Sequence, residues 1–405
     1  MQRINRISYL EWLIGHKDKQ LIKVVSGVRR CGKSTLFDIY RDYLRQEGIE
    51  ESQIISLNFE DIEYEDLCDY RPLYDFIKMK LLPDKMNYIF LDEVQHVKEF
   101  EKAVNTLFLS ENCDVYMTGS NAYFMSGELA TRLSGRYTEL KMLPLSFAEF
   151  YSGLSEERQG LTKTEKFNLY LELSSFPYIL RYNYGPKEAK EYLRDIYNTV
   201  LLKDIVARLR VSDVNTLENV TKFILHNIGN RVSPTKIAGT LKSQGKSVDQ
   251  KTVDRYLRGL TDSLIVYEAV RYNIKGKQFL TQQNKYYAVD VTLRNILVRG
   301  KDSDIGHILE NVVYLELLRR GHEVYAGQLD DGSEVDFVAI NSQGMCYYQV
   351  SATTLDEETL KRELASLRKI ADNYPKYLLT LDEVFGNADY EGIQKKNVID
   401  WLLGR

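Results

Sequence analysis

Residues Gly27-Val28-Arg29-Arg30-Cys31-Gly32-Lys33-Ser34 form the stretch of this sequence that decides its fold. They follow the apolar run Leu21-Ile22-Lys23-Val24-Val25-Ser26 and precede a segment that we expect to be helical from Ser34. A Gly-x4-Gly-Lys-Ser loop between a strand and a helix is typical of phosphate binding. The glycines let backbone N–H groups turn toward a phosphate, the lysine reaches the phosphate oxygens, and the serine hydroxyl ligates magnesium. The loop therefore predicts a site for ATP and Mg²⁺ with the following binding residues: Gly27, Arg30, Cys31, Gly32, Lys33, Ser34 and Thr35.

A second strand ends in two carboxylates. The apolar run Tyr88-Ile89-Phe90-Leu91 leads directly into Asp92 and Glu93. Phosphoryl transfer depends on positioning and on charge neutralisation more than on covalent chemistry. We expect Asp92, with Ser34, to hold Mg²⁺, and Glu93 to act as the base that polarises the attacking water, while Lys33 reaches the β- and γ-phosphate oxygens. Alone, such a strand is common, but its combination with the upstream loop is specific.

A third strand ends in small polar residues, in the run Val115-Tyr116-Met117-Thr118-Gly119-Ser120-Asn121. We expect Asn121 to sense the γ-phosphate or the water, with Ser120 as the alternative. Arg136 follows, and a cation there could stabilise transition-state charge at the nucleotide of a neighbouring subunit. Arg132 competes for this role, and an ordinary surface arginine is the equally weighted alternative.

The bulk composition indicates a multidomain chain without a membrane span. With 405 residues, 44% of them hydrophobic, it is long enough for about two to four domains. The apolar runs are far shorter than the roughly 20 residues needed to cross a bilayer, and the N-terminus has no apolar signal core. The four cysteines are scattered without CxxC spacing, which argues against both a disulfide framework and a zinc ribbon. We therefore expect a cytoplasmic protein.

The order of predicted elements gives an α/β multidomain fold. Strands alternate with helices up to about residue 142, which favours a parallel sheet, and the pattern is then helical to about residue 219, as in a lid over a nucleotide site. The predicted domains are an ATPase core at 1–152, a helical lid at 153–219, a winged helix at 220–300 and a C-terminal α/β domain at 301–405.

The predicted winged helix combines two helices and a hairpin with a positive charge. A helix begins at Ser233-Pro234, a second follows from about Asp249, and a hairpin turns at Lys275-Gly276-Lys277. Residues 231–300 carry 13 lysines and arginines against 5 acidic residues, a net charge of +8 in a chain whose total is −4. Phosphate contacts from such residues dominate DNA affinity. We expect DNA contacts from Lys251, Arg255, Arg258, Arg271, Lys275 and Lys277, although such modules also serve as protein-docking surfaces.

The last hundred residues resemble a nuclease fold of the PD-(D/E)XK type. Glu310 on a helix, Asp336 on a strand and Gln349-Val350-Ser351 on the next strand follow its pattern. That chemistry needs two acidic metal ligands and a lysine, and here Gln349 and Ser351 occupy the places of the second acid and the lysine. We expect a degenerate site that does not cut, unless Lys361 or Arg362 takes over the role of the lysine.

Together these motifs resemble the AAA+ branch of P-loop ATPases, and more narrowly a prokaryotic family of the AAA_14/DUF4143 type. The resemblance also rests on Leu-Pro-Leu-Ser-Phe-Ala-Glu-Phe at 143–150 and on Lys285-Tyr286-Tyr287. It implies a homo-oligomeric ring or partial ring with the nucleotide at subunit interfaces. The family's lid often carries Gly-Gly-Phe-Pro where this chain has Ser174-Ser175-Phe176-Pro177, so Arg181 is only a candidate for the lid arginine.

The motifs and the predicted domains are compatible with three functions. The leading hypothesis is an AAA+ ATPase that couples Mg-ATP hydrolysis to the binding or remodelling of DNA, with branched DNA among the candidates. The second is a nucleotide switch that signals through protein contacts. The third is an ATP-gated nuclease.

Overall fold

A computed structural model describes residues 4–120, 133, 135–246, 248–298 and 305–404. The chain divides into two compact units, Met1–Pro144 with Asp262–Leu264, and Leu145–Thr261 with Ile265–Arg405. Within the described ranges, no helix is both long and apolar enough to cross a membrane.

The first unit is a parallel sheet of five strands in the order β2-β3-β4-β1-β5. Its strands are β1 (Ile22–Gly27), β2 (Ile54–Asn58), β3 (Asn87–Asp92), β4 (Cys113–Ser120) and β5 (Tyr137–Met142). Its helices are α1 (Ile7–Gly15), α2 (Lys33–Gln46), α3 (Tyr70–Lys80) and α4 (Phe100–Phe108), with short turns η1 (Glu51–Gln53), η2 (Ile62–Leu67) and η3 (Val94–His96). The sequence predicted the first four strands and the parallel sheet, which the structure confirms, but it did not predict β5.

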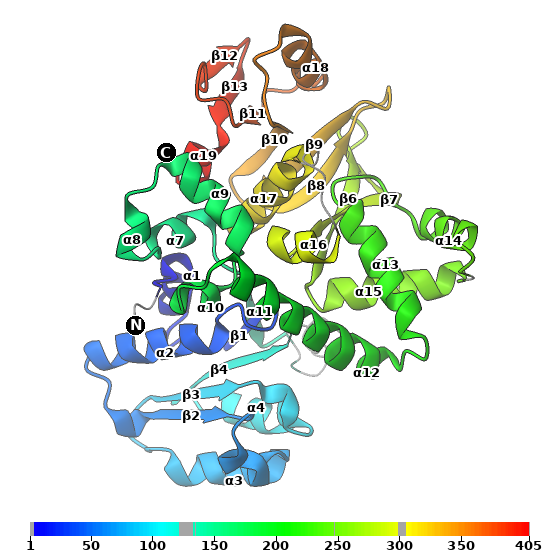
Figure 1. Ribbon diagram of the computed structural model, residues 1–405. Coiled ribbons are helices and arrows are strands. Elements are labelled where there is room, and N and C mark those ends of the chain that lie inside the picture. The colour runs from blue at the N-terminus through cyan, green and yellow to red at the C-terminus, as the bar shows by residue number, and fades with distance from the viewer. Residues whose placement is uncertain (1–3, 121–132, 134, 247, 299–304, 405) are drawn as a thin grey trace. The chain divides into compact units, whose positions relative to one another are not determined.

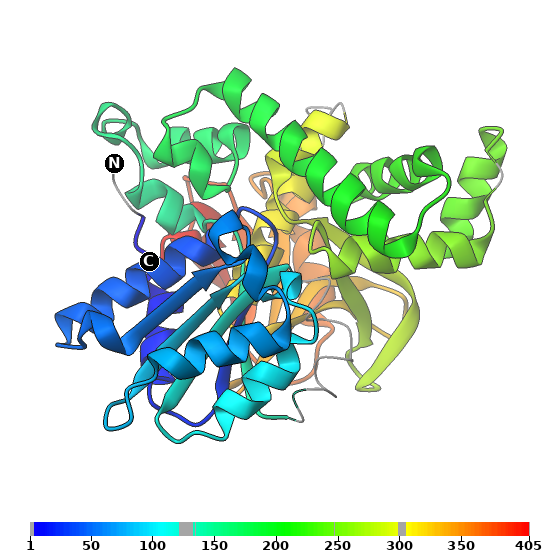
Figure 2. The ribbon, with the colours of Figure 1, turned by 90° about the horizontal axis from the view of Figure 1, so that it is seen from below.

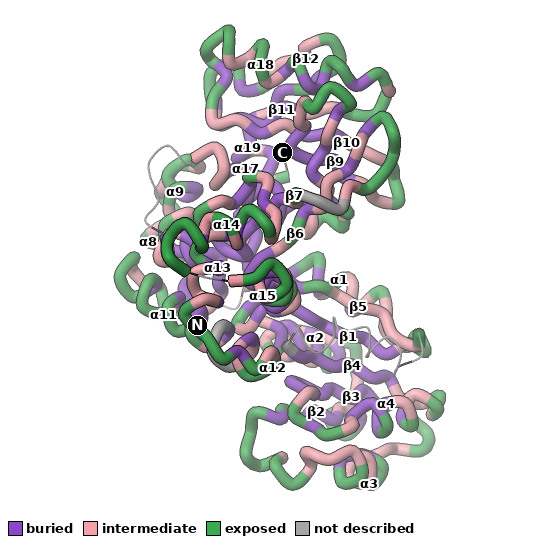
Figure 3. The backbone as a smooth tube through the Cα atoms, turned by 90° about the vertical axis from the view of Figure 1, so that its right-hand side faces the viewer, coloured by how far each residue is buried: buried purple, intermediate pink, exposed green. Residues whose placement is uncertain are grey.

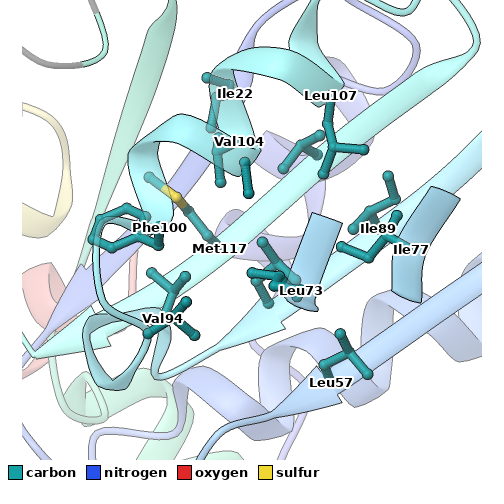
Figure 4. Packing of buried hydrophobic residues seen from close by; sticks show 14 of the residues in the cluster. Ile22, Leu57, Leu73, Ile77, Ile89, Val94, Phe100, Val104, Leu107 and Met117 are labelled. Carbon is teal, nitrogen blue, oxygen red and sulfur yellow. The ribbon is translucent and has the colours of Figure 1, made fainter. Parts of the chain in front are cut away.

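Both faces of this sheet are covered, because successive side chains of each strand point to opposite faces. On one face, Ile89 and Met117 pack against Leu73 of α3 and Val104 of α4 in one buried cluster (Figure 4). On the other face, α2 packs against the strands (Figure 2), with Phe37 of α2 and Phe90 of β3 in edge contact at 5.2 Å. The sheet is therefore a buried layer that holds the ends of its strands in fixed positions.

The second unit begins with a run of helices (Figure 1). They are α7 (Phe147–Ser152), α8 (Glu156–Gln159), α9 (Lys163–Leu173), α10 (Pro177–Arg181), α11 (Pro186–Asn198), the π-helix η4 (Thr199–Val206), α12 (Ala207–Leu209), α13 (Val214–His226), α14 (Pro234–Ser243) and α15 (Gln250–Asp262). The Ser233 hydroxyl accepts the Lys236 N–H at 3.2 Å and so begins α14 where the sequence predicted. In α15, the predicted apolar face of Val253, Tyr256, Leu257 and Leu260 is buried.

An eight-stranded sheet in the order β12-β13-β11-β10-β9-β8-β6-β7 completes the second unit. Its strands are β6 (Val266–Asn273), β7 (Gln278–Ala288), β8 (Glu323–Gln328), β9 (Glu334–Asn341), β10 (Gly344–Ser351), β11 (Lys376–Thr380), β12 (Ala388–Tyr390) and β13 (Ile393–Asn397). The accompanying helices are α16 (Val291–Leu297), α17 (Ile305–Arg319), α18 (Glu357–Arg368) and α19 (Val398–Leu402). Figure 3 shows that α17 and much of β9 and β10 are buried, whereas α18 keeps an exposed face.

The predicted hairpin is present as β6 and β7, which pair antiparallel around the turn at Lys275-Gly276-Lys277. It does not stand apart as a free wing. β6 also pairs in parallel with β8, with Arg271 opposite Ala326. The domain limit expected at residue 300 therefore falls between segments that share one continuous sheet.

The Ser174-Ser175 pair has a conformational explanation. Ser174 adopts φ 108° and ψ 159°, a region that is essentially reserved for glycine. The Ser174 hydroxyl donates to Asp290 Oδ2 at 2.9 Å, and both the backbone N–H and the hydroxyl of Ser175 bond the same oxygen. Hydrogen bonds to Asp290 thus offset the strain of a serine at a position that suits the glycine of the resembled family.

Candidate functional site

The glycine loop lies at the carboxyl end of β1, where two of its residues must be glycine. A Cβ on Gly27 would lie 2.4 Å from the carbonyl oxygen of Met142 and 2.8 Å from Cys31 Sγ. Gly32 has φ 104°, which favours glycine. The loop conformation therefore requires the two glycines of the motif for separate reasons, close approach at Gly27 and backbone angle at Gly32.

Lys33 is buried at the start of α2 and faces both the loop and the second carboxylate. Its Nζ lies 3.2 Å from the carbonyl oxygen of Gly27 and 3.5 Å from Glu93 Oε1. Burial by itself would lower the pKa of Lys33, but the nearby negative groups, Glu93 and Asp92 among them, outweigh it and raise the pKa above its ordinary value. The site therefore holds a charged ammonium.

Asp92 is hydrogen-bonded by two hydroxyl groups. The Ser34 hydroxyl bonds to its carboxylate, and so does the Thr118 hydroxyl. Burial raises the pKa of Asp92, and these two hydrogen bonds act against the rise. The structure thus brings together the serine and the aspartate that the sequence assigned to one metal ion.

Glu93 follows directly in a left-handed conformation, with φ 54°. Its backbone N–H donates to Thr118 Oγ1 at 3.0 Å, and its Oε2 accepts from Gln95 Nε2 at 2.6 Å. Burial by itself would raise the pKa of Glu93, but Lys33 and the Gln95 hydrogen bond lower it below its ordinary value. Glu93 is therefore a charged, oriented carboxylate, as expected of a base.

Sequence reasoning missed Thr118 and Gln95. Thr118 links Asp92 to the backbone of Glu93, and its signal was a buried hydroxyl residue in an apolar strand just before Gly119-Ser120. Gln95 lies three residues after Asp92 and is the last residue of the Phe-Leu-Asp-Glu-Val-Gln motif on which the family resemblance rests. The resemblance assigned it no role, and its contact with Glu93 depends on the turn at Glu93.

Other predicted loop residues differ in exposure. Arg30 is exposed, Thr35 is half-buried and Cys31 is buried. Burial raises the pKa of the Cys31 thiol, which keeps it protonated and unreactive. The buried Arg6 guanidinium donates to the carbonyl oxygen of Cys31 at 3.1 Å and to that of Leu143 at 2.7 Å, so the loop is also supported from the N-terminal segment.

The third motif is placed only in part. Ser120 pairs with Gly27 in the register of β4 and β1, which brings the end of β4 beside the loop. Asn121 and Arg132 lie outside the described residues. Arg136 precedes β5, whose first residue pairs with Ile22 at the start of β1, and its guanidinium lies 5.3 Å from the Phe108 ring centroid. Arg136 is therefore at the opposite end of β1 from the loop, about 20 Å away along the strand.

Five of the six predicted DNA-contacting residues are exposed, and Arg271 is partly buried. Lys251, Arg255 and Arg258 are exposed on α15, although Arg258 pairs with Asp254 at 2.9 Å. Lys275 and Lys277 are exposed in the hairpin turn, and Lys275 pairs with Asp330 at 3.0 Å.

Arg271 differs from the other five because it is only partly exposed. Its guanidinium bonds Gln328, which lies on β8, the strand that pairs with β6. Arg181, the candidate lid arginine, is exposed at the end of α10, with its guanidinium 5.7 Å from the Tyr182 ring centroid.

The C-terminal pattern converges as predicted, with one exception. Glu310, Asp336 and Gln349 lie together: Lys285 Nζ is 2.9 Å from Glu310 Oε1 and 3.6 Å from Asp336 Oδ1, and Gln349 Oε1 accepts from the Asp336 N–H at 3.3 Å. Ser351 points away, since its hydroxyl donates to the carbonyl oxygen of Thr353 at 3.0 Å. Burial and the charge of Glu310 raise the pKa of Asp336 to about 7.

Neither residue proposed to replace the lysine reaches this cluster. Lys361 pairs with Glu357 at 2.6 Å, and Arg362 pairs with Glu363 at 2.9 Å, and both cations are exposed on α18. The cation in the cluster is Lys285 of β7, which sequence reasoning had treated only as part of a family motif. Among the described residues, no group of three or more histidine, cysteine, aspartate or glutamate side chains is arranged to hold a metal ion.

The five-stranded parallel sheet, the glycine loop after β1 and the paired carboxylates at the end of β3 define a P-loop protein of the AAA+ class. The chain belongs to the AAA_14 family, whose model, described as an AAA domain, matches residues 19–151. A second family model, described as a domain of unknown function, DUF8612, matches residues 164–304. The DUF4143 resemblance stays a prediction.

Two relatives and one solved structure are similar to this chain. An uncharacterized protein of Haemophilus influenzae is 39% identical over 401 residues, covering 99% of this chain and 98% of the relative. An uncharacterized protein of Methanocaldococcus jannaschii is 27% identical over 94% of this chain and 85% of its own length. The Walker-type ATPase of Pyrococcus abyssi superposes with a TM-score of 0.52 at 15% identity, over 73% of this chain and 96% of that one, which shows the fold alone.

Proposed function

We propose that this chain binds Mg-ATP at the loop of residues 27–35 and hydrolyses it. The observation that carries the proposal is the convergence of two pairs at the loop, Ser34 with Asp92 and Lys33 with Glu93. The first pair supplies a hydroxyl and a carboxylate, which are the oxygen ligands that Mg²⁺ uses beside phosphate. The second pair supplies a cation for the phosphates and a base for water.

The ion pair between Lys33 and Glu93 suggests how ATP would change the site. The β- and γ-phosphates would compete with Glu93 for the Lys33 ammonium, which now lies 3.5 Å from the carboxylate. Glu93 would then be free to accept a proton from water, while Gln95 and Thr118 keep it oriented. Bound magnesium would supply charge neutralisation at the β- and γ-phosphates.

Steady-state ATPase assays on four variants test this proposal. We expect Lys33→Ala to abolish nucleotide binding, Glu93→Gln to retain binding but lose turnover by roughly 100-fold or more, and Asp92→Asn to raise the Mg²⁺ concentration needed. The exposed Lys78 on α3 offers a matched control, because Lys78→Ala removes the same charge outside the loop. Full turnover in Lys33→Ala, or equal loss in Lys78→Ala, would contradict the assignment.

We propose further that the active form is a homo-oligomer in which Arg136 faces the nucleotide of a neighbouring subunit. Arg136 lies at the end of β1 remote from the loop, so it cannot serve the site of its own chain. In a head-to-tail assembly, mixing Arg136→Ala chains with Glu93→Gln chains places an intact Arg136 beside an intact Glu93 at some interfaces. Recovery of ATPase activity on mixing two inactive variants is expected, and the absence of recovery would contradict this role.

For the coupled activity we propose DNA binding through the exposed face of α15. The support is the net charge of +8 in residues 231–300 together with three exposed cations opposite a buried stripe. We expect Lys251→Glu with Arg255→Glu to weaken DNA binding and to remove any stimulation of ATP turnover by duplex or branched DNA. Lys187→Glu with Lys190→Glu, exposed on α11, changes the charge equally on another helix and serves as the control.

Fluorescence anisotropy at two salt concentrations reads out the contacts, because each lost phosphate contact reduces the salt dependence by about one unit of slope. If the Lys251→Glu, Arg255→Glu variant binds DNA as tightly as the natural chain, the exposed face of α15 is better explained as a protein-docking surface of a nucleotide switch.

A further inference from the structure

Lys285 is a buried ammonium enclosed by carboxylates from two different elements. Its Nζ lies 2.9 Å from Glu310 Oε1 on α17, and 3.5 Å from Glu334 Oε2 and 3.6 Å from Asp336 Oδ1 on β9. Lys285, Glu310 and Asp336 have relative exposures of 4%, 6% and 9%. Glu334 is the more exposed member, and it also pairs with Arg231 at 2.6 Å.

The other polar atoms of the cluster have partners in the protein. Tyr287 donates its hydroxyl to Glu310 Oε1 at 2.6 Å, and the Val350 N–H donates to Asp336 Oδ2 at 2.8 Å. Gln349 bonds the Asp336 N–H and, through its Nε2, Glu363 at 2.9 Å. Lys285 is therefore the cation that Glu310, Glu334 and Asp336 share, while Arg231 also pairs with Glu334 and His307 Nδ1 lies 3.6 Å from Glu310 Oε2.

Glu310 and Asp336 are the acidic residues of the nuclease-like pattern that this chain retains, whereas Gln349 and Ser351 stand in the places of its second acidic ligand and its lysine. A divalent ion bound between these carboxylates would be in contact with the Lys285 ammonium, and like charges at that distance in a buried site repel strongly. Lys285 Nζ lies 2.9 Å from Glu310 Oε1 and 3.6 Å from Asp336 Oδ1, so the ammonium itself occupies the position between the two carboxylates where such an ion would bind.

We propose that Lys285 is the permanent cation of this cluster and occupies the place of a divalent metal ion. The C-terminal fold then carries no metal-dependent cleavage, and the same contacts hold the β6–β7 hairpin against α17 and β9. This proposal is independent of ATP hydrolysis in the first unit.

Manganese binding to the nucleotide-free full chain tests the proposal, with free Mn²⁺ followed by electron paramagnetic resonance. In the natural chain, we expect Asp336→Asn to leave Mn²⁺ binding unchanged. We expect Lys285→Met to bind one Mn²⁺ per chain, and the double variant Lys285→Met with Asp336→Asn to lose that ion. Asp92→Asn, measured in parallel, identifies any ion held at the nucleotide site.

Lys395 provides a matched control. It is equally buried, but it pairs at 2.8 Å with the single carboxylate of Asp382, so Lys395→Met should create no Mn²⁺ site. If Lys285→Met folds only when Mn²⁺ is present, the metal ion has taken the structural place of the Lys285 ammonium, as the proposal requires.

Three outcomes would overturn the proposal. They are Mn²⁺ binding by the natural chain that Asp336→Asn or Glu310→Gln removes, a Lys285→Met chain that is folded yet binds none, and a Lys285→Met chain that stays unfolded with and without Mn²⁺. Magnesium-dependent DNA cleavage lost in both Lys285→Met and Asp336→Asn would instead identify Lys285 as a catalytic lysine.

Discussion

Arg6 donates a guanidinium hydrogen bond to the carbonyl oxygen of Cys31, at 3.1 Å, and thereby joins the segment before the first helix to the glycine loop. A second nitrogen of the same group donates to the carbonyl oxygen of Leu143 at 2.7 Å. Arg6→Met would leave these buried carbonyl groups unsatisfied, so we expect the free energy of unfolding of the first unit to fall by about 2–4 kcal/mol.

Urea titration followed by circular dichroism measures this loss. Arg71→Met, at an exposed arginine on α3, should change stability by less than about 0.5 kcal/mol. Equal stability of Arg6→Met and the natural chain would show that the buried guanidinium does not stabilise the loop.

Thr118 offers a test of the support behind the acidic pair. Thr118→Val keeps the side-chain shape but removes the hydroxyl that bonds Asp92 and the Glu93 N–H. Since groups behind metal ligands typically contribute about 10–100-fold to affinity or activity, we expect kcat to fall by about that factor. Thr118→Ser restores the hydroxyl and should recover most of the rate. A Val variant with full activity would remove Thr118 from the site.

Ser174 allows the backbone strain to be measured. Ser174→Gly relieves a conformation that costs about 1–3 kcal/mol for other residues, while it loses the hydroxyl bonds to Asp290 and to the Phe176 N–H. Ser174→Ala loses the same bonds and keeps the strain. We therefore expect the glycine variant to be more stable than the alanine variant by about 1–2 kcal/mol, in thermal or urea unfolding. The reverse order would rule out the strained conformation.

We expect Asp382 to stabilise the folded chain by an amount that depends on pH. Burial by itself would raise its pKa, but hydrogen bonds from Lys395, Thr353 and Thr354 hold the pKa at about 2. Because the folded pKa is lower than the unfolded one, the stabilisation is fully present above the unfolded pKa and is lost as the pH falls from about 4 to about 2. Its size is about 2 kcal/mol.

Acid titration of the free energy of unfolding checks this expectation. Asp382→Asn should lower stability at neutral pH and flatten its dependence on pH between about 4 and about 2. An unchanged acid limb in this variant would assign the acid sensitivity to other carboxylates.

The sequence predicted most elements because their signals are local. The apolar runs of β1, β3 and β4, the glycine loop and the Ser233 cap each depend on neighbouring residues. β5 escaped prediction because Tyr137–Met142 is a half-exposed edge strand that has neither a continuous apolar run nor a strict alternation of polar and apolar residues.

The differences between prediction and structure at the candidate sites have a common physical origin, which is pairing between distant segments. The contact of Arg271 with Gln328 was not predicted because a hairpin alone does not reveal that β8 will pair with its first strand. Lys285 was missed as a site residue because its carboxylate partners come from α17 and β9. No spacing rule along the chain connects such residues, whereas Asp92 and Glu93 follow from the topology of parallel strands.

The parallel pairing of β6 with β8 also determines which segments of this part of the chain depend on one another to fold. A fragment ending at residue 300 would leave β6 with an unpaired edge, which is prone to aggregation. A fragment of residues 305–404 would lose two strands and the cation that neutralises Glu310 and Asp336. The hairpin and the C-terminal sheet should therefore be expressed together in any shortened form of the chain.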